Sequence, residues 1–262
     1  MSDPLFEERD GRYVPSAHTR GPWDAATQHG GAPAALLARE IERLDPGADM
    51  FVARVTYDYL GPVSLAPLAA QATIARHGKR LQLVEAELRA DAGVIVRARA
   101  VRLRRRAVDL PDLALAPAGV PFPGPEAAVH TPFPADTGDE GFHRTGMEIR
   151  WVEGSYAEPG PARAWFRFAR PLVGDERPTA LQLAVAAADF GNGVSRVLDF
   201  DSHLFVNTDL TVHLHREPAG DWILLDAESV ADPAGVGMAR SALYDTQGPL
   251  GIAAQTLFVE AR

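Results

Sequence analysis

The stretch LQLVEAELRADAGVIVRARAVRL, residues 81–103, decides how the rest of the chain is interpreted. Apolar and polar side chains alternate along it, which predicts two half-buried strands at 81–90 and 94–104. The DAG between these strands is a hairpin turn signal. WILLDAESVADPAGVGMARSAL, residues 222–243, repeats the plan with DPAG as its turn. The chain therefore contains one supersecondary unit twice, and this duplication determines the expected architecture.

Matching elements lie around both hairpins. Each half has one expected helix, at 32–43 and at 178–190, and long antiparallel strands. The strands FVARVTYDYL, beginning at Phe51, and FVNTDLTVHL, beginning at Phe205, take equivalent places. The remaining expected strands are 68–77, 147–152, 163–170, 204–216, 222–230, 236–244 and 252–259.

The second helix, PTALQLAVAAADF, is apolar on most sides. A helix needs such a surface when a curved antiparallel sheet wraps around it, which is the hotdog arrangement. We therefore predict an α+β protein of two fused hotdog domains, at 1–106 and 141–262. Between them, 107–140 is expected to be a linker, because prolines cluster at 111, 117, 121, 123, 125, 132 and 134.

Composition excludes several classes of protein. The chain has no cysteine, which rules out thiolate nucleophiles, disulfides and cysteine-based zinc sites and fits a cytoplasmic location. The N-terminus lacks a secretory signal, and no apolar run approaches the ~20 residues that span a bilayer. A net charge of −9 does not suit a nucleic-acid binder. The basic run Arg102, Arg104, Arg105 and Arg106 is interpreted as the solvated end of a strand rather than a phosphate site.

Three stretches resemble the TesB-like (type II) acyl-CoA thioesterases. They are TQHGGAPAALLA at 27–38, DLTVHLHREP at 209–218 and WILLDAESVADPAGVGMARSALYDTQGPL at 222–250. The similarity covers most of the chain except the proline-rich segment. It implies a double hotdog enzyme of lipid metabolism that hydrolyses an acyl-CoA to free acid and CoA. The resemblance implies neither a metal nor a cofactor.

The resemblance also implies a water held by an Asp, a Thr or Ser, and a Gln. The Asp corresponds to Asp189, at the end of the second helix, and the Thr position corresponds to Asn207. The Gln position falls on Thr256 by ungapped count, and a one-residue bulge would bring Gln255 into that place. One catalytic residue is thus kept, one is replaced by another hydrogen-bonding side chain, and one is displaced.

Each candidate also has a structural interpretation. Asp189 could simply end its helix, with Gly191 as the stop, and Asn207 could form a cross-strand hydrogen bond. The backbone N–H groups of Gly30 and Gly31 could bind an oxyanion at the helix start, or the two glycines could form a tight turn. His29 beside them could donate a proton, contact the ligand or be structural.

Two further side-chain types remain to be placed. Arg216 could contact the CoA phosphates or an acidic neighbour. His213 and His215 share one strand face, but no further ligand stands at a convincing spacing, so no metal site is predicted. The sequence contains neither a GxSxG elbow nor a Walker loop.

Two alternatives to a thioesterase stay open. A hydratase or dehydratase of β-hydroxyacyl thioesters could use His29 and Asp189, from opposing halves, as acid and base. A non-catalytic acyl-CoA binder would fit the incomplete catalytic set. Hotdog sheets also pair edge to edge, so a homo-oligomer can form in addition to the pair within the chain.

Overall fold

The computed structural model describes residues 3–45, 49–116, 118–130 and 140–262. In these residues, eleven antiparallel strands form one sheet in the order β4-β5-β6-β3-β10-β13-β12-β11-β8-β7, with β9 pairing to β13. The first-half strands are β3 (Met50–Tyr59), β4 (Ala69–Arg76), β5 (Leu81–Ala90) and β6 (Gly93–Arg104). The second-half strands are β7 (Met147–Glu153), β8 (Ala162–Phe168), β9 (His203–Asn207), β10 (Asp209–Leu214), β11 (Ile223–Asp232), β12 (Val236–Asp245) and β13 (Gly248–Ala261).

The two halves meet where β3 pairs with β10, a pairing that we call the seam. These are the two strands that the sequence comparison made equivalent. Tyr57 pairs with Leu210 and Thr56 pairs with Thr211, and the Thr211 hydroxyl lies 3.1 Å from that of Thr56. An approximate twofold axis therefore passes through the seam between these two pairs.

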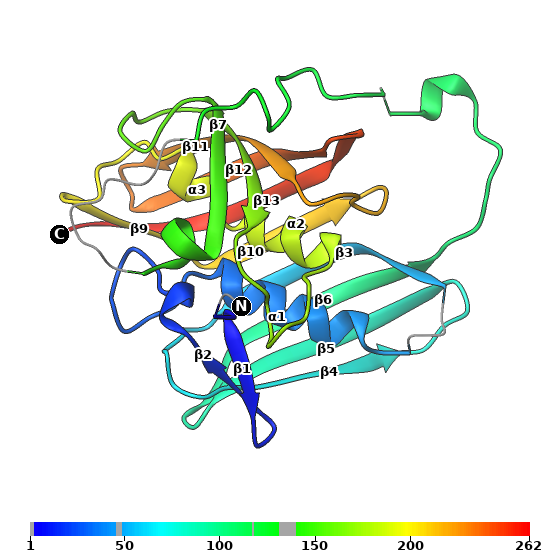
Figure 1. Cartoon of the computed structure of the whole chain (residues 1–262), viewed down its shortest axis with the longest axis horizontal. Helices are drawn as coiled ribbons and strands as arrows, with labels where there is room; N and C mark the ends of the chain where they lie inside the picture. Colours follow the sequence, from blue (N-terminus) through cyan, green and yellow to red (C-terminus); the bar gives the residue numbers. More distant parts are fainter. Residues whose placement is uncertain (1–2, 46–48, 117, 131–139) are drawn as a thin grey trace.

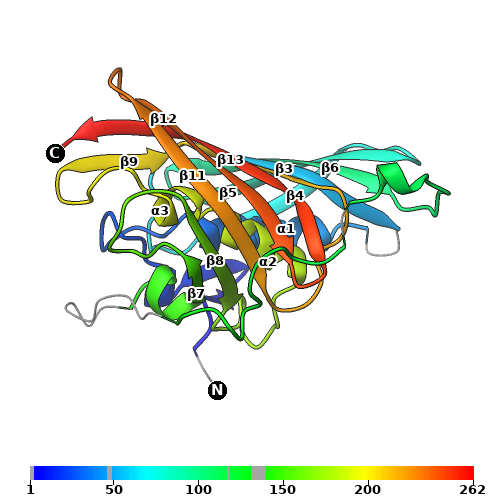
Figure 2. The ribbon, with the colours of Figure 1, turned by 90° about the horizontal axis from the view of Figure 1, so that it is seen from above.

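Helices α1 (Gly31–Glu42) and α2 (Ala180–Ala188) lie side by side on one face of the sheet. Figure 2 shows the sheet curving over both of them. Every α2 residue after the first is buried, and most of α1 is buried as well. Both helices are apolar because the sheet covers them, as expected. The predicted double hotdog of the α+β class is confirmed.

The ends of the two helices contact each other in a related way. Thr179 and Gln182 form a capping box at the start of α2. Glu42, at the end of α1, accepts hydrogen bonds from both side chains, at 2.9 Å from the Thr179 hydroxyl and 2.7 Å from the Gln182 amide. At the opposite ends, Asp189 caps α2 beside the start of α1. The approximate twofold axis relates these two junctions.

Several elements differ from the expectations. The hairpin of β1 (Phe6–Arg9) and β2 (Arg12–Pro15) was not predicted. The strand expected at 204–216 is broken at Thr208, whose N–H donates to Thr256 O, so β9 and β10 are separate. Short helical turns occur as η1 (Ala17–Thr19), η2 (Asp112–Ala114), a π-helical turn η3 (Phe142–Gly146) and α3 (Gly191–Val194).

The proline-rich segment leaves β6 and runs outside the sheet toward the second half (Figure 1). Leu113 is 98% exposed there, whereas Pro123 accepts a hydrogen bond from the Trp165 indole. Pro117, Pro132 and Pro134 lie outside the described residues. The domain limits at 106 and 140 stay a prediction.

The basic run at the end of β6 is only partly solvated. Arg104, Arg105 and Arg106 are exposed as expected, and Arg105 pairs with Asp49 and Glu217. Arg102 is 4% exposed, which corrects the expectation for that residue. Its guanidinium donates to Leu44 O at 3.0 Å, so it ties β6 to the end of α1. Among the described residues, no helix combines the length and the apolar character needed to cross a membrane.

Candidate active site

Asp189 is the C-cap of α2, with helical backbone angles of φ −68° and ψ −16°, and it is 5% exposed. Gly191 is not a left-handed helix stop, because it lies in the next helical turn, α3. A Cβ at Gly191 would lie 2.8 Å from Ser241 Oγ and 3.1 Å from Gln255 Oε1. Close packing, rather than helix termination, therefore requires glycine at this position.

Three side chains surround the Asp189 carboxylate. His29 Nδ1 lies 2.9 Å from Oδ2, while the Asn207 amide and the Tyr59 hydroxyl donate to Oδ1 at 2.8 and 3.2 Å. His29 and Tyr59 come from the first half and Asn207 from the second. The Asn207 side chain thus bonds to Asp189, although Asn207 also pairs across the sheet through its backbone. The structure therefore brings Asp189, Asn207 and His29 together.

Tyr59 was missed by sequence reasoning. Burial, followed by the nearby Asp189 charge, raises its pKa well above the ordinary value, so the hydroxyl remains a donor at neutral pH. The same hydroxyl lies 3.1 Å from Gly30 O. The sequence did place Tyr59 near the end of an expected strand that has an equivalent in the second half. It did not show that this end of the strand lies beside the start of α1, so it gave no reason to select Tyr59.

Gly30 is packed against this cluster. A Cβ at Gly30 would lie 2.9 Å from both Asp189 Oδ2 and the Tyr59 hydroxyl. Gly30 is the N-cap of α1 and lines the same cavity as Asp189. Among the described residues, none accepts a hydrogen bond from its N–H. Glycine is therefore required for close approach, and its N–H remains available at the start of a helix.

His29 Nδ1 has two close neighbours, one acceptor and one donor. A protonated Nδ1 can bond only to the acceptor, and an unprotonated Nδ1 can bond only to the donor. Nδ1 lies 2.9 Å from Asp189 Oδ2 and 3.1 Å from the Gly31 N–H. We assign the proton to Nδ1, because the bond to a carboxylate is charge-assisted and stronger than one from a backbone amide. The ring stacks on Phe190 at 4.3 Å between centroids, which fixes its orientation.

Gln255, rather than Thr256, lies beside Asp189. Its amide nitrogen donates to Asp189 O at 3.1 Å, and its Oε1 accepts from the Asn192 N–H at 3.0 Å. Gln255 is 2% exposed, whereas the Thr256 side chain is on the exposed face of β13. A register shift at Leu243/Tyr244 on the neighbouring β12 precedes this pair. Such a bulge adds one residue to a strand, so aligning two sequences without gaps across it can give a position that is wrong by one residue.

A cavity of about 460 Å³ opens onto these groups. We call it the Asp189 cavity. Its polar lining includes Asp189, Asn207, His29, Gly30 and Tyr59. Its apolar lining includes Trp23, Val63, Leu204 and Val206. A largely apolar pocket with a few convergent polar groups is the usual form of a small-molecule site.

Like Gln255 and Thr256, the predicted residues Arg216 and Gly31 do not line the Asp189 cavity. Arg216 forms a two-point ion pair with Asp245 at 2.6 and 2.7 Å, and it also donates to Gly248 O. Burial raises the pKa of Asp245, but hydrogen bonds from Arg216 and from backbone N–H groups outweigh it and bring the pKa below its ordinary value. Arg216 thus has the acidic neighbour that was one of its two interpretations. The N–H of Gly31 is directed at His29 Nδ1 rather than into the cavity.

No group of three metal-ligating side chains is found in the described part of the chain, and His213 stands exposed on β10. The described residues that line the Asp189 cavity therefore do not form a cluster of metal ligands.

Family models match nearly the whole chain. Residues 19–103 match the N-terminal domain of acyl-CoA thioesterases, and residues 125–259 match their C-terminal domain. The chain belongs to the acyl-CoA thioesterase family. This thioesterase is accordingly a thioester hydrolase, as the resemblance implied. No protein of curated function matches the sequence.

Solved structures share the fold of this thioesterase at low sequence identity. A hot dog fold protein from Alicyclobacillus acidocaldarius has a TM-score of 0.74 at 18% identity, covering 97% of this chain and 96% of its own. The tesB protein of Mycobacterium avium subs paratuberculosis has 0.64 at 18%, covering 97% and 95%. The acyl-CoA thioesterase II TesB2 of Mycobacterium marinum has 0.60 at 15%, covering 90% of both chains.

Proposed function

We propose that this thioesterase hydrolyses acyl-CoA by means of a water molecule that Asp189 binds and deprotonates. The observation that carries the proposal is the buried Asp189 carboxylate, held by three donors at the wall of an apolar cavity. Asn207 and Tyr59 donate hydrogen bonds to Oδ1 of Asp189, and His29 donates one to Oδ2. One acceptor position of Oδ2 therefore remains for a water.

The chemistry needs one proton acceptor and one oxyanion site. The water oxygen attacks the thioester carbonyl carbon as its proton passes to Asp189. The developing oxyanion accepts a hydrogen bond from the Gly30 N–H, at the positive end of α1. The carbon–sulfur bond then breaks, and the CoA thiolate leaves and takes up a proton. These steps require neither a metal ion nor a cofactor.

Gln255 acts on this reaction through the backbone. Its two hydrogen bonds hold the turn from Asp189 to Asn192. We assign it a positioning role, in place of the direct water contact that the resemblance implied. Thr256 has no part in the proposed reaction, because its side chain is on the exposed face of β13.

The test is the Asp189→Asn variant, assayed by CoA release with a thiol reagent across short, medium, long and aromatic acyl-CoAs. The absence of cysteine keeps the protein background low. We expect kcat to fall about 10²–10⁴-fold, as is usual when a general base is lost. Asp91→Asn, at an exposed ion pair with Arg12, is the matched control and should retain activity. Undiminished turnover by Asp189→Asn would overturn the mechanism.

A second candidate is a hydratase or dehydratase. The direct contact between His29 and Asp189, from opposing halves, is the observation that favours it. Water addition to crotonyl-CoA, followed by loss of ultraviolet absorbance, separates the two reactions. Absorbance loss without CoA release would establish the hydratase, whereas tight acyl-CoA binding with neither reaction would establish a binder.

A further inference from the structure

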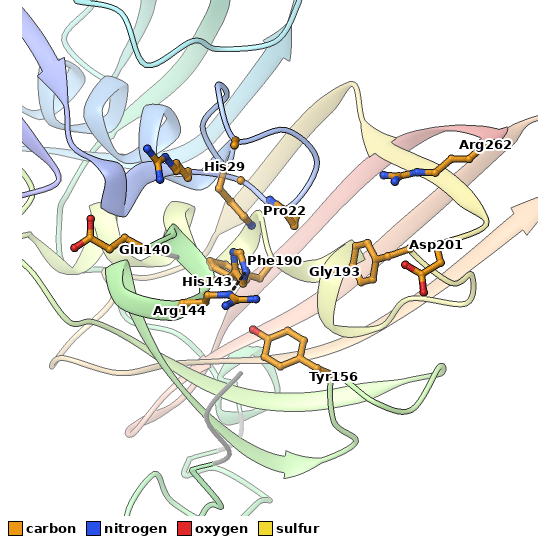
Figure 3. A pocket seen from close by; sticks show the side chains of 14 residues that line it. Pro22, His29, Glu140, His143, Arg144, Tyr156, Phe190, Gly193, Asp201 and Arg262 are labelled. Atoms are coloured by element: carbon orange, nitrogen blue, oxygen red, sulfur yellow. Dashed lines mark hydrogen bonds between the residues drawn. The ribbon is translucent and has the colours of Figure 1, made fainter. Parts of the chain in front are cut away.

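A second cavity, of about 410 Å³, adjoins the Asp189 cavity. We call it the arginine cavity, because Arg20, Arg144 and Arg262 line it (Figure 3 labels the last two). The two cavities share part of their lining, including His29 and Phe200. The two cavities therefore lie on either side of His29.

The two cavities differ in charge. Three arginines line the arginine cavity against two carboxylates, Glu140 and Asp201. In the Asp189 cavity the charged lining residues are Asp24 and Asp189, and both are acidic. An anionic group is thus repelled from the Asp189 cavity and attracted to the arginine cavity.

Among the described residues, Arg20 and Arg262 have no carboxylate partner within ion-pair distance. Arg20 Nε is buried and has no hydrogen-bond partner in that part of the chain. Arg262 lies over the Trp23 ring, 5.7 Å from its centroid. A buried guanidinium donor without a partner is costly, and a phosphate oxygen is the acceptor that its geometry fits best.

The third arginine reaches the cavity on the π-helical turn η3, which also carries His143 into the lining. Such wide helical turns are rare and are frequently found at functional sites. The turn is fixed to the first half, because the Phe142 N–H donates to Arg20 O at 2.9 Å. Arg20 and Arg144 are therefore held on the same wall.

We propose that the arginine cavity binds the phosphate-bearing part of coenzyme A. The acyl chain then occupies the apolar Asp189 cavity, and the thioester lies between them at His29. This inference rests on the proposed function, since it assigns the two ends of the same substrate. It follows from the charge difference, the unpaired Arg20 Nε donor and the shared lining.

The first experiment compares two substrates with the same thioester, one with and one without the 3′-phosphoadenosine diphosphate part of coenzyme A. The ratio of kcat/KM for an acyl-CoA to kcat/KM for the same acyl-pantetheine thioester is measured for wild type, Arg20→Gln and Arg262→Gln. We expect the ratio to fall about tenfold in each variant, the effect of one lost charged contact. Arg240→Gln, on the outer sheet face and paired with Glu228, is the matched control and should keep the wild-type ratio.

The second experiment measures binding without turnover. Calorimetry should show that adenosine 3′,5′-bisphosphate competes with CoA for the wild type and that both bind about tenfold more weakly to Arg20→Gln. Arg20→Lys keeps the charge and should recover part of the CoA affinity, which a folding defect would not allow. Affinity should also decrease as salt is added.

The two proposals fail separately. If the wild type releases CoA but neither variant changes the ratio or the affinity, the phosphate site is overturned and the proposed hydrolysis stands. If the wild type releases no CoA from any substrate, yet CoA binding depends on Arg20, the hydrolysis is overturned and the phosphate site stands.

Discussion

Gly30 is a residue at which the active site leaves no room for a side chain. Its α-carbon faces the Asp189 carboxylate and the Tyr59 hydroxyl, so an added methyl group must displace one of them. Both contacts lie in the proposed catalytic cluster. The position therefore affects activity more than it affects folding.

We expect Gly30→Ala to lower kcat about 10²-fold, because a displacement of about 1 Å in a catalytic group has that effect. Its free energy of unfolding should change by about 1 kcal/mol or less, as for other N-cap substitutions. Steady-state kinetics and urea unfolding measure the two quantities. Gly124→Ala, where nothing lies within 4 Å of the added carbon, is the control. Wild-type kcat in Gly30→Ala would contradict the assigned geometry.

His143 should make stability depend on pH. Burial, together with the nearby His29 and Arg144, lowers its pKa to about 3, against 6.5 in the unfolded chain. Between these values the unfolded state binds a proton that the folded state does not. Stability is therefore highest above pH 6.5 and is lost as the pH falls toward 3.

We expect the free energy of unfolding attributable to His143 to be about 2 kcal/mol lower at pH 5 than at pH 7. His143→Gln should remove that part of the pH dependence. Urea unfolding of both proteins at the two pH values measures the difference. Parallel pH curves for wild type and variant would show that His143 titrates normally.

The sequence predicted part of this residue cluster. Asp189 and Asn207 were identified from the spacing of the resemblance and His29 from its place beside Gly30, and the structure places Asp189 in contact with both. The choice between Gln255 and Thr256 depended on a one-residue irregularity that an ungapped count does not reveal. Tyr59 depends on how a strand end meets a helix start in three dimensions, which periodicity does not encode.

At the scale of elements, helix α2 depends on its capping box. Thr179 accepts from the Gln182 N–H at 3.2 Å, and the Gln182 side chain accepts from the Thr179 N–H at 3.2 Å. Both side chains also donate to Glu42, so the cap joins the two helices. An apolar helix under a sheet needs such a cap, because its first N–H groups otherwise lack partners.

We expect Thr179→Ala to lower the free energy of unfolding by about 1 kcal/mol. Gln182→Ala should have a similar effect, and the double variant should lose less than the sum, because both belong to one network. Urea unfolding of the three variants completes the cycle. Additive losses would mean that the two side chains act independently.

Among the elements, long periodic segments were predicted best. The hairpin strands expected at 81–90, 94–104, 222–230 and 236–244 agree with the structure within two residues, because alternation over many residues marks one buried face. The β1–β2 hairpin was missed because its strands have only four residues each. The break at Thr208 was missed because both flanking strands continue the same alternation.

For the whole molecule, the seam joins the two halves into one continuous sheet over one buried core. The buried core includes Leu36 of α1 and Val185 of α2 in one cluster, and the sheet runs without interruption from β4 to β7. The family assignment agrees with this arrangement, because both domain models match one chain. Assembly into homo-oligomers stays a prediction.

We expect a single unfolding transition in urea. Three of the four tryptophans, Trp151, Trp165 and Trp222, lie in the second half and weight fluorescence toward it, whereas far-ultraviolet circular dichroism reports on both halves equally. The two curves should coincide, as they do when no intermediate is populated. A separate fluorescence transition would show that the halves unfold independently.

The twofold axis at the seam relates two helix junctions that have become unlike. One holds the Asp189 carboxylate among His29, Asn207 and Tyr59, while in the other Glu42 accepts hydrogen bonds from Thr179 and Gln182. Two identical halves would carry two equivalent centres. With the one centre that we propose at Asp189, we expect one acyl group to bind per polypeptide, so titration with a tight inhibitor should end at one equivalent. The second junction then only holds the two helices together.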